Sequence, residues 1–330
     1  MAVTEPDSAS KIIPDDDKNA TSLKRICFSD IDGTLVHYRE SQDQYGELTT
    51  PSVLANCMIW VEKESGRRHK LLMLPPSATN AQGMISIKTL TDLSRMRSAG
   101  TMLVLVTGAR TATLLQRLPF LPAADAYVCE NGGRIFYPDA TLPTACQLAE
   151  DARWRARHTP TVGATSHDSL PAAERKGLLW DTMRALMAQG WEPDTFSYST
   201  AFRLRLQEGK TEEDLTEALA SLPAGLAHSR NLHAADVYPE TSGKDNAARH
   251  LMQRFDAAPH GCFLLCDDDN DLRLAALVGK AFVVGATAPS VAAAARADPE
   301  RFVLAQRGGT LGIEELMEKV EDFVGSFILG

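Results

Sequence analysis

The stretch Ile26–Leu35 constrains the chain most, because an apolar run ends there in two carboxylates one residue apart. Its first three residues are apolar and Gly33 stops the run, a pattern typical of a buried strand in a parallel sheet. Ligands of such sheets bind beyond the carboxyl ends of the strands. We therefore expect Asp30 and Asp32 to face a crevice at the end of this strand.

Two carboxylates this close in sequence point to a metal site. As anions they repel each other unless a cation lies between them or one of them holds a proton. Carboxylate oxygens are the ligands that hard divalent ions prefer, so the pair predicts a bound Mg²⁺. Taken alone, the stretch leaves a second interpretation open, because Asp and Gly are also common in solvated surface turns.

Length and charge limit the class of protein. With 330 residues, 44% of them hydrophobic, the chain exceeds what one simple domain needs, so two domains or a sizeable insertion are expected. A net charge of −9 without a basic stripe argues against a nucleic-acid partner. No apolar run could span a membrane, and residues 1–23 lack the features of a signal or transit peptide, so we expect a cytoplasmic protein without a membrane partner. Nothing in the sequence indicates an oligomeric state.

The six cysteines are scattered, as buried free thiols of a reducing compartment are. Cys262 and Cys266 have the spacing of half a zinc site. Apolar residues separate them, however, and no second Cys or His pair follows, so core packing is the expected role.

The apolar patterns predict an α/β chain interrupted by a second unit. Residues 1–23 are expected to form a disordered leader, and 36–84 an inserted hairpin or flap. Parallel-sheet strands are predicted at 24–30, 102–106, 126–129, 262–266 and 281–284, with a further strand at 134–137. Helices are predicted at 90–100, 111–118, 246–255, 291–297 and 313–327. A further helix is predicted to follow Asp271 and to end at Val278.

Residues 139–238 change in character and predict an inserted α+β domain. A helix is expected over 170–189, closed by Gly190, then a strand at 201–206, a helix at 211–220 and an extended piece at 232–238. The core is then formed by 24–138 and 239–330, with the flap-like insertion at 36–84 and a cap domain at 139–238.

Four element ends carry distinct chemical groups: Asp30 with Asp32, Thr107, Lys244, and the acidic run Asp267–Asp271. Each alone has a structural interpretation, as a turn, a strand end, an exposed lysine at a helix start or a solvated acidic loop. In this order, they resemble the four motifs of the haloacid dehalogenase superfamily of phosphohydrolases.

This resemblance covers residues 24–138 and 239–330. Placing the insertion after Glu130-Asn131-Gly132-Gly133 resembles the branch with a large α/β cap, which includes Cof-like sugar-phosphate phosphatases, sucrose-phosphate phosphatases and phosphomannomutases. It implies a Rossmann-like core with a central parallel sheet, plus the inserted α+β cap.

The resemblance also implies roles for the motif residues. Asp30 would attack phosphorus to give an aspartyl-phosphate, and Asp32 would act as general acid and base. Mg²⁺ would be held by the Asp30 carboxylate, the Asp32 main-chain carbonyl and Asp267. Lys244 would stabilise the transition state. The phosphate would be bound by Gly33, Thr107, Gly108, Lys244 and Asn270, and Asp271 would position Lys244 or the waters on the metal.

The chain departs from the family pattern in two motifs. Arg110 comes one residue later than the arginine of many relatives, so no substrate role is expected for it. Cys266 stands where relatives commonly have glycine. In the cap, Arg203 and Arg205 alternate onto one face of a strand. Contact with an anionic substrate is one interpretation, and a solvent-facing strand surface is the expected one.

The implied function is a Mg²⁺-dependent phosphoric monoester hydrolase acting on a small phosphorylated metabolite, a sugar or polyol phosphate, under a closing cap. One alternative is a phosphomutase of the phosphomannomutase type, which returns the phosphoryl group to the sugar. A second is a non-catalytic binding protein on the same scaffold, which the presence of Asp30, Asp32, Lys244 and Asp267 disfavours.

Overall fold

The computed structural model describes residues 24–53, 56–76, 81–142, 147–231, 234–285 and 288–326. The predicted leader, residues 1–23, lies outside this part of the chain, as does Cys146. The other five cysteines are buried free thiols, as predicted. None of the helices described is both long and apolar enough to cross a bilayer.

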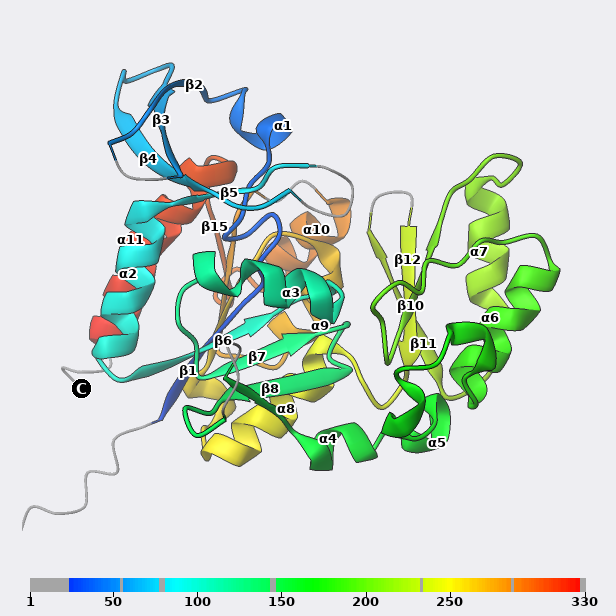
Figure 1. Cartoon of the computed structure of the whole chain (residues 1–330). Coiled ribbons are helices and arrows are strands. Elements are labelled where there is room, and N and C mark those ends of the chain that lie inside the picture. Colours follow the sequence, from blue (N-terminus) through cyan, green and yellow to red (C-terminus); the bar gives the residue numbers. More distant parts are fainter. Residues whose placement is uncertain are drawn as a thin grey trace, which may run out of the picture.

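An eight-stranded sheet forms the centre of the molecule (Figure 1). In spatial order its strands are β15 (Phe302–Leu304), β14 (Lys280–Val283), β13 (Phe263–Cys266), β1 (Arg25–Ser29), β6 (Thr101–Val106), β7 (Ala126–Cys129), β8 (Arg134–Pro138) and β9 (Leu148–Glu150). The strands from β15 to β7 run parallel, and β8 and β9 are antiparallel additions. The predicted α/β class with a central parallel sheet is confirmed.

Helices bury both faces of this sheet. One face is covered by α2 (Ile87–Ser98), α3 (Thr111–Arg117) and α11 (Gly309–Ser326). The other face is covered by α4 (Ala152–Ala156), α8 (Lys244–Phe255), α9 (Leu272–Ala275) and α10 (Pro289–Ala297). In β1, Cys27 joins the first core while Ile26 and Phe28 join the second. Burial on both faces explains why residues 26–28 of this strand are all apolar.

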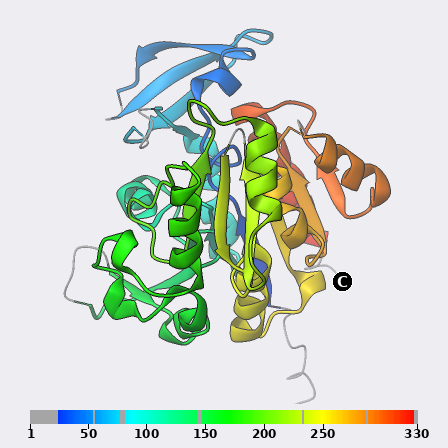
Figure 2. The same cartoon turned by 90° about the vertical axis from the view of Figure 1, so that its right-hand side faces the viewer.

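A three-stranded antiparallel sheet lies within the predicted cap, beside the main sheet (Figures 1 and 2). Its order is β10 (Phe202–Arg205), β12 (Ala234–Pro239) and β11 (Leu226–Asn231), with α5 (Thr159–Val162), α6 (Leu178–Ala188) and α7 (Glu212–Ala220) nearby. Leu179, Trp180 and Leu215 pack with Phe202 in a separate apolar core. The division into core and cap stays a prediction.

The helix predicted over 170–189 is wrong in its first half. Gly177 has φ 124°, a conformation that ends any preceding helix, and only the short 3₁₀ turn Ala172–Glu174 comes before it. Similarly, the helix predicted after residue 271 ends at Ala275 rather than at Val278.

The 36–84 segment contains a four-stranded antiparallel sheet, more than the single hairpin expected. After α1 (Arg39–Gln42), it consists of β2 (Gly46–Pro51), β3 (Cys57–Glu62), β4 (Arg68–Met73) and β5 (Met84–Ser86). Trp60 and Met84 pack with Leu311 of α11. This segment also contributes the buried His69, whose Nδ1 lies 3.2 Å from a Glu314 oxygen. This sheet is therefore anchored on α11.

Candidate active site

The loop after β1 carries the first motif at the middle of the main sheet. The Asp30 N–H donates to the Leu265 carbonyl at 3.0 Å, which ties the loop to the neighbouring β13. Gly33 has φ 89°, and a Cβ there would lie 1.9 Å from Asp267 Oδ2. Glycine therefore allows the close approach of Asp267, at the end of β13, to this loop.

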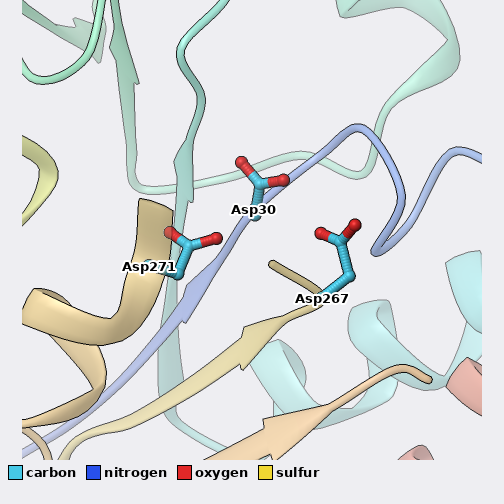
Figure 3. Close-up of side chains that lie close together, drawn as sticks. All are labelled: Asp30, Asp267 and Asp271. Atoms are coloured by element: carbon cyan, nitrogen blue, oxygen red, sulfur yellow. The ribbon is translucent and has the colours of Figure 1, made fainter. Parts of the chain in front are cut away.

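Three carboxyl groups meet at this edge: Asp30, Asp267 and Asp271 each offer an oxygen within 4.8 Å of the others. Figure 3 shows Asp30 beyond the end of β1, with Asp271 and Asp267 on either side. The Thr34 hydroxyl donates to Asp267 Oδ1 at 2.8 Å. Asp271 Oδ2 is buried and accepts no hydrogen bond from any residue that the structure describes. An oxygen cluster with an unused buried acceptor fits a hard divalent cation.

The electrostatics support the same fit. Burial raises the pKa of Asp30 to about 7, opposed by the Lys244 ammonium and reinforced by Asp271. Burial, with the charge of Asp30 beside it, raises the pKa of Asp267 well above its usual range. Crowded carboxylates of this kind are stabilised in their charged form by a bound cation. The residues present therefore suit Mg²⁺. Asp271, for which only a positioning role was expected, lies in one cluster with the predicted ligands Asp30 and Asp267.

Lys244 is not an exposed lysine at a helix start. It is the first residue of α8, and its buried Nζ donates to Asp30 Oδ1 and to Asp271 Oδ1, each at 2.8 Å. Asn270 Oδ1 lies 3.4 Å from the same nitrogen. Burial acts to lower the pKa of Lys244, but Asp271 and Asp30 together hold it above its ordinary value. The side chain is therefore a fixed positive charge beside the Asp30 carboxylate.

A pocket of about 340 Å³ opens above these groups. Predicted site residues in its wall are Asp30, Asp32, Thr107, Gly108, Asp267 and Asn270. Lys244 and Asp271 lie behind Asp30 through the hydrogen bonds above, and Gly33 contacts Asp267. The structure thus brings together the predicted residues of all four motifs.

The pocket wall also includes three arginines to which the sequence assigned no role in the site: Arg110, Arg203 and Arg205. Arg203 and Arg205 of β10 border the pocket, so their face does not meet solvent alone as expected, although the Arg205 side chain is 43% exposed. Arg203 donates to both carboxylate oxygens of Asp236 at 2.6 and 2.7 Å. Arg110 donates to both oxygens of Asp194, one of them at 2.5 Å.

Sequence reasoning missed Tyr38 and Arg117, which line the pocket and contact Asp32, and Asp236, the partner of Arg203. Arg117 is 85 residues from Asp32 in the chain, so no local spacing could link the two. Asp236 is different, because it faces Arg203 across the β10–β12 ladder and a correct strand pairing would have found it.

Comparison with known proteins finds one partial family match and several structures of the same fold. Residues 180–319 match the model of a family described as sucrose-6F-phosphate phosphohydrolase. No curated protein sequence is similar enough to be matched with this chain. Among solved structures, the sucrose-phosphatase of Synechocystis sp., determined with sucrose and phosphate, has 14% identity and a TM-score of 0.57, covering 91% of this chain and 98% of its own.

Two further structures agree over nearly the whole chain. A Thermoplasma acidophilum protein has 11% identity and a TM-score of 0.57, covering 91% of this chain and 99% of its own. A haloalkanoate-superfamily phosphatase of Bacteroides thetaiotaomicron has 13% identity and a TM-score of 0.51, covering 96% and 99%. The chain has the haloacid dehalogenase fold. The predicted resemblance to that superfamily is confirmed by the fold, and the predicted enzyme class, a phosphatase, agrees with the description of the matched family.

The family match and the haloacid dehalogenase motifs overlap in part. The matched residues include Lys244, Asp267 and Asp271, while Asp30 and Asp32 precede them.

Proposed function

We propose that this phosphatase is Mg²⁺-dependent and hydrolyses a sugar or polyol phosphate through an aspartyl-phosphate on Asp30. The observation that carries the proposal is the buried group of Asp30, Asp267 and Asp271 with the Lys244 ammonium 2.8 Å from two of them. Cytoplasmic location and the lack of nucleic-acid and membrane partners stay predictions.

Asp30 is arranged for attack on phosphorus. Its Oδ1 is held by Lys244, whereas Oδ2 accepts no hydrogen bond from any described residue and can act as nucleophile. As the bond from Oδ2 to phosphorus forms, the bond from phosphorus to the leaving oxygen breaks, and Asp32 gives that oxygen a proton. Asp32 then takes a proton from water, which attacks phosphorus and releases phosphate from Asp30.

The positive charges act on the phosphoryl oxygens. Lys244 is pre-positioned, so it stabilises the developing charge without reorganisation. Mg²⁺ would be held by the Asp30, Asp267 and Asp271 carboxylates together with the Asp32 main-chain carbonyl, and it supplies further positive charge for the phosphoryl group. Thr107 and the backbone at Gly108 lie in the pocket wall, where a phosphoryl oxygen can accept their hydrogen bonds.

The pocket wall formed by Arg110, Arg203 and Asp236 favours a leaving group with several hydroxyl groups. In this wall Arg203 is paired with Asp236, which places donors and acceptors side by side, and Arg110 is also a wall residue, with its charge paired with Asp194. Such walls suit sugar hydroxyl groups, which both donate and accept hydrogen bonds. The similar Synechocystis structure holds sucrose and phosphate, which supports the same class of substrate.

The test is phosphate release from a panel of sugar, polyol, glycerate and nucleotide phosphates, with Mg²⁺ or with chelator. We expect chelator-sensitive release from a sugar or polyol phosphate, none with Asp30→Asn, and weakened Mg²⁺ dependence with Asp267→Asn. Asp269→Asn is the matched control, because Asp269 is an exposed acid in the same loop. Release that is insensitive to chelator, or full activity of Asp30→Asn, would refute the proposal.

The same reactions distinguish the alternatives. A phosphomutase would convert a hexose 1-phosphate into its 6-phosphate with no release of free phosphate. A non-catalytic protein would bind a phosphate ester and leave it unchanged over the whole panel.

A further inference from the structure

Three hydrogen bonds form a closed triangle between the side chains of Asp32, Tyr38 and Arg117. Arg117 Nη1 donates to Asp32 Oδ1 at 2.6 Å, and the Tyr38 hydroxyl donates to the same oxygen at 2.5 Å. Arg117 Nη2 donates to the Tyr38 hydroxyl at 2.7 Å. Three separate elements therefore meet at one carboxylate oxygen: the loop after β1, the residue before α1, and the end of α3.

The Arg117 guanidinium is buried, so its hydrogen-bond partners are fixed. The Arg117 side chain is 5% exposed and the Asp32 side chain 35%. A guanidinium removed from water must find acceptors, and Asp32 and Tyr38 are the side-chain partners of Arg117 within the described ranges. The planar guanidinium can serve both acceptors at once, which the point charge of a lysine cannot do with the same geometry.

The triangle leaves one oxygen of Asp32 available. Both hydrogen bonds fall on Oδ1, and Oδ2 receives none from the part of the chain described here. Asp32 lines the same pocket as Asp30 and Thr107. The carboxylate is thus anchored through Oδ1, while Oδ2 is free of described donors on a residue that lines the pocket.

We infer that Arg117 and Tyr38 are positioning residues that hold Asp32 ready for proton transfer to the leaving oxygen. The inference rests on the proposed function, in which Asp32 is the general acid. Fixing the side chain in one orientation avoids the loss of rotamer freedom during the reaction, and proton transfer depends steeply on placement. Arg117 also links this acid to the second motif, because α3 begins four residues after Thr107.

A merely structural ion pair is the competing explanation, and the leaving group distinguishes the two. An alkoxide needs a proton as it departs, whereas p-nitrophenolate is a weak base and departs without one. The ratio kcat/KM covers the steps up to formation of the aspartyl-phosphate, so it reports departure of the leaving group and not the later attack by water.

The experiment compares kcat/KM for the preferred sugar or polyol phosphate with kcat/KM for p-nitrophenyl phosphate. For Arg117→Met we expect a loss of about 10²-fold with the alkyl ester, the low end of the usual effect of general acid catalysis, and a change of only a few fold with the aryl ester. Tyr38→Phe should show the same selectivity with a smaller loss. Arg97→Met is the matched control, because Arg97 pairs with Asp125 through two hydrogen bonds at 3.0 and 2.7 Å outside this pocket.

A double mutant tests whether Arg117 acts through Asp32. Asp32→Asn should reproduce the selective loss, and adding Arg117→Met to it should cause little further loss, because residues that act as one unit are not additive. Melting temperatures confirm that each variant is folded.

Equal losses with both esters, or additive losses in the double mutant, would overturn the role of Arg117 and leave the phosphatase proposal intact. A wild-type enzyme that hydrolyses neither ester with Mg²⁺ would instead refute the proposed function, and the inference with it.

Discussion

The buried carboxylate of Glu130 joins the main sheet to the predicted cap, and its replacement by glutamine should destabilise the protein. Glu130 follows β7 and is fully buried. Its Oε2 accepts from the Ser199 N–H at 2.8 Å, the Thr200 N–H at 2.7 Å and the Thr200 hydroxyl at 2.8 Å. Its Oε1 accepts from the Thr111 hydroxyl at 2.5 Å. Ser199 and Thr200 lie just before β10, so this one side chain ties that strand to the end of β7.

The magnitude follows from the number of donors. A hydrogen bond to a charged acceptor contributes about 1.5–3 kcal/mol and one to a neutral acceptor about 0.5–1.5 kcal/mol, so neutralising Glu130 weakens each of four bonds by about 1 kcal/mol. The amide still places an oxygen opposite Ser199 and Thr200, and Thr111 can rotate its hydroxyl to accept from the amide nitrogen. Removing a buried charge also relieves its desolvation cost, so we expect Glu130→Gln to lower the free energy of unfolding by about 2 kcal/mol.

Urea unfolding followed by circular dichroism measures this change. Glu150→Gln is the matched control, because Glu150 makes two hydrogen bonds with Arg134, both at 2.7 Å, but is partly exposed. We expect the control to lose less than about 1 kcal/mol, as is usual for ion pairs near the surface. Equal unfolding free energies for Glu130→Gln and the wild type would show that the four bonds contribute no net stability.

Two further predictions concern a buried cation and a buried histidine. Lys244→Met should lower kcat of the Mg²⁺-saturated enzyme by about 10³-fold, because a pre-positioned positive charge is lost. The rate of phosphate release by a variant shown to be folded measures this effect. A loss of less than tenfold would contradict the role of Lys244. Burial lowers the pKa of His37 from 6.5 to about 4, so its neutral form stabilises the folded state fully above pH 6.5, and this contribution is lost as the pH falls toward 4. His37→Gln should decline less in unfolding free energy over that interval, measured by urea titrations at several pH values, and parallel curves for the two proteins would disprove the assignment.

Much of the main sheet and its site could be predicted because the information is local. Strands such as β1 and β13 contain short apolar runs, at residues 26–28 and 263–266, and each is followed by the acidic residues that begin a motif. Parallel strands bring their carboxyl ends to one edge, so the order of the motifs along the chain is enough to place Asp30, Thr107 and Asp267 together.

The rest depends on contacts between distant residues. β15 and β11 were not predicted, because the first has three residues and the second, Leu226–Asn231, mixes polar and apolar side chains without alternation. The 36–84 sheet depends on Trp60 packing with Leu311, and Asp32 on Arg117, partners that no local period reveals. Arg203 and Arg205 alternate as expected on β10, but only the three-dimensional arrangement shows that their face covers the pocket.

The most direct test of the mechanism is to trap the phosphorylated enzyme. The wild type is mixed with Mg²⁺ and a hydrolysed sugar or polyol phosphate, quenched in acid and treated with borohydride, which reduces an acyl phosphate of aspartate to homoserine. Peptide mass spectrometry should then find homoserine at position 30, dependent on substrate and on Mg²⁺. Active enzyme that carries no modification at Asp30, or carries it on another carboxylate, would contradict the assignment of Asp30 as the nucleophile.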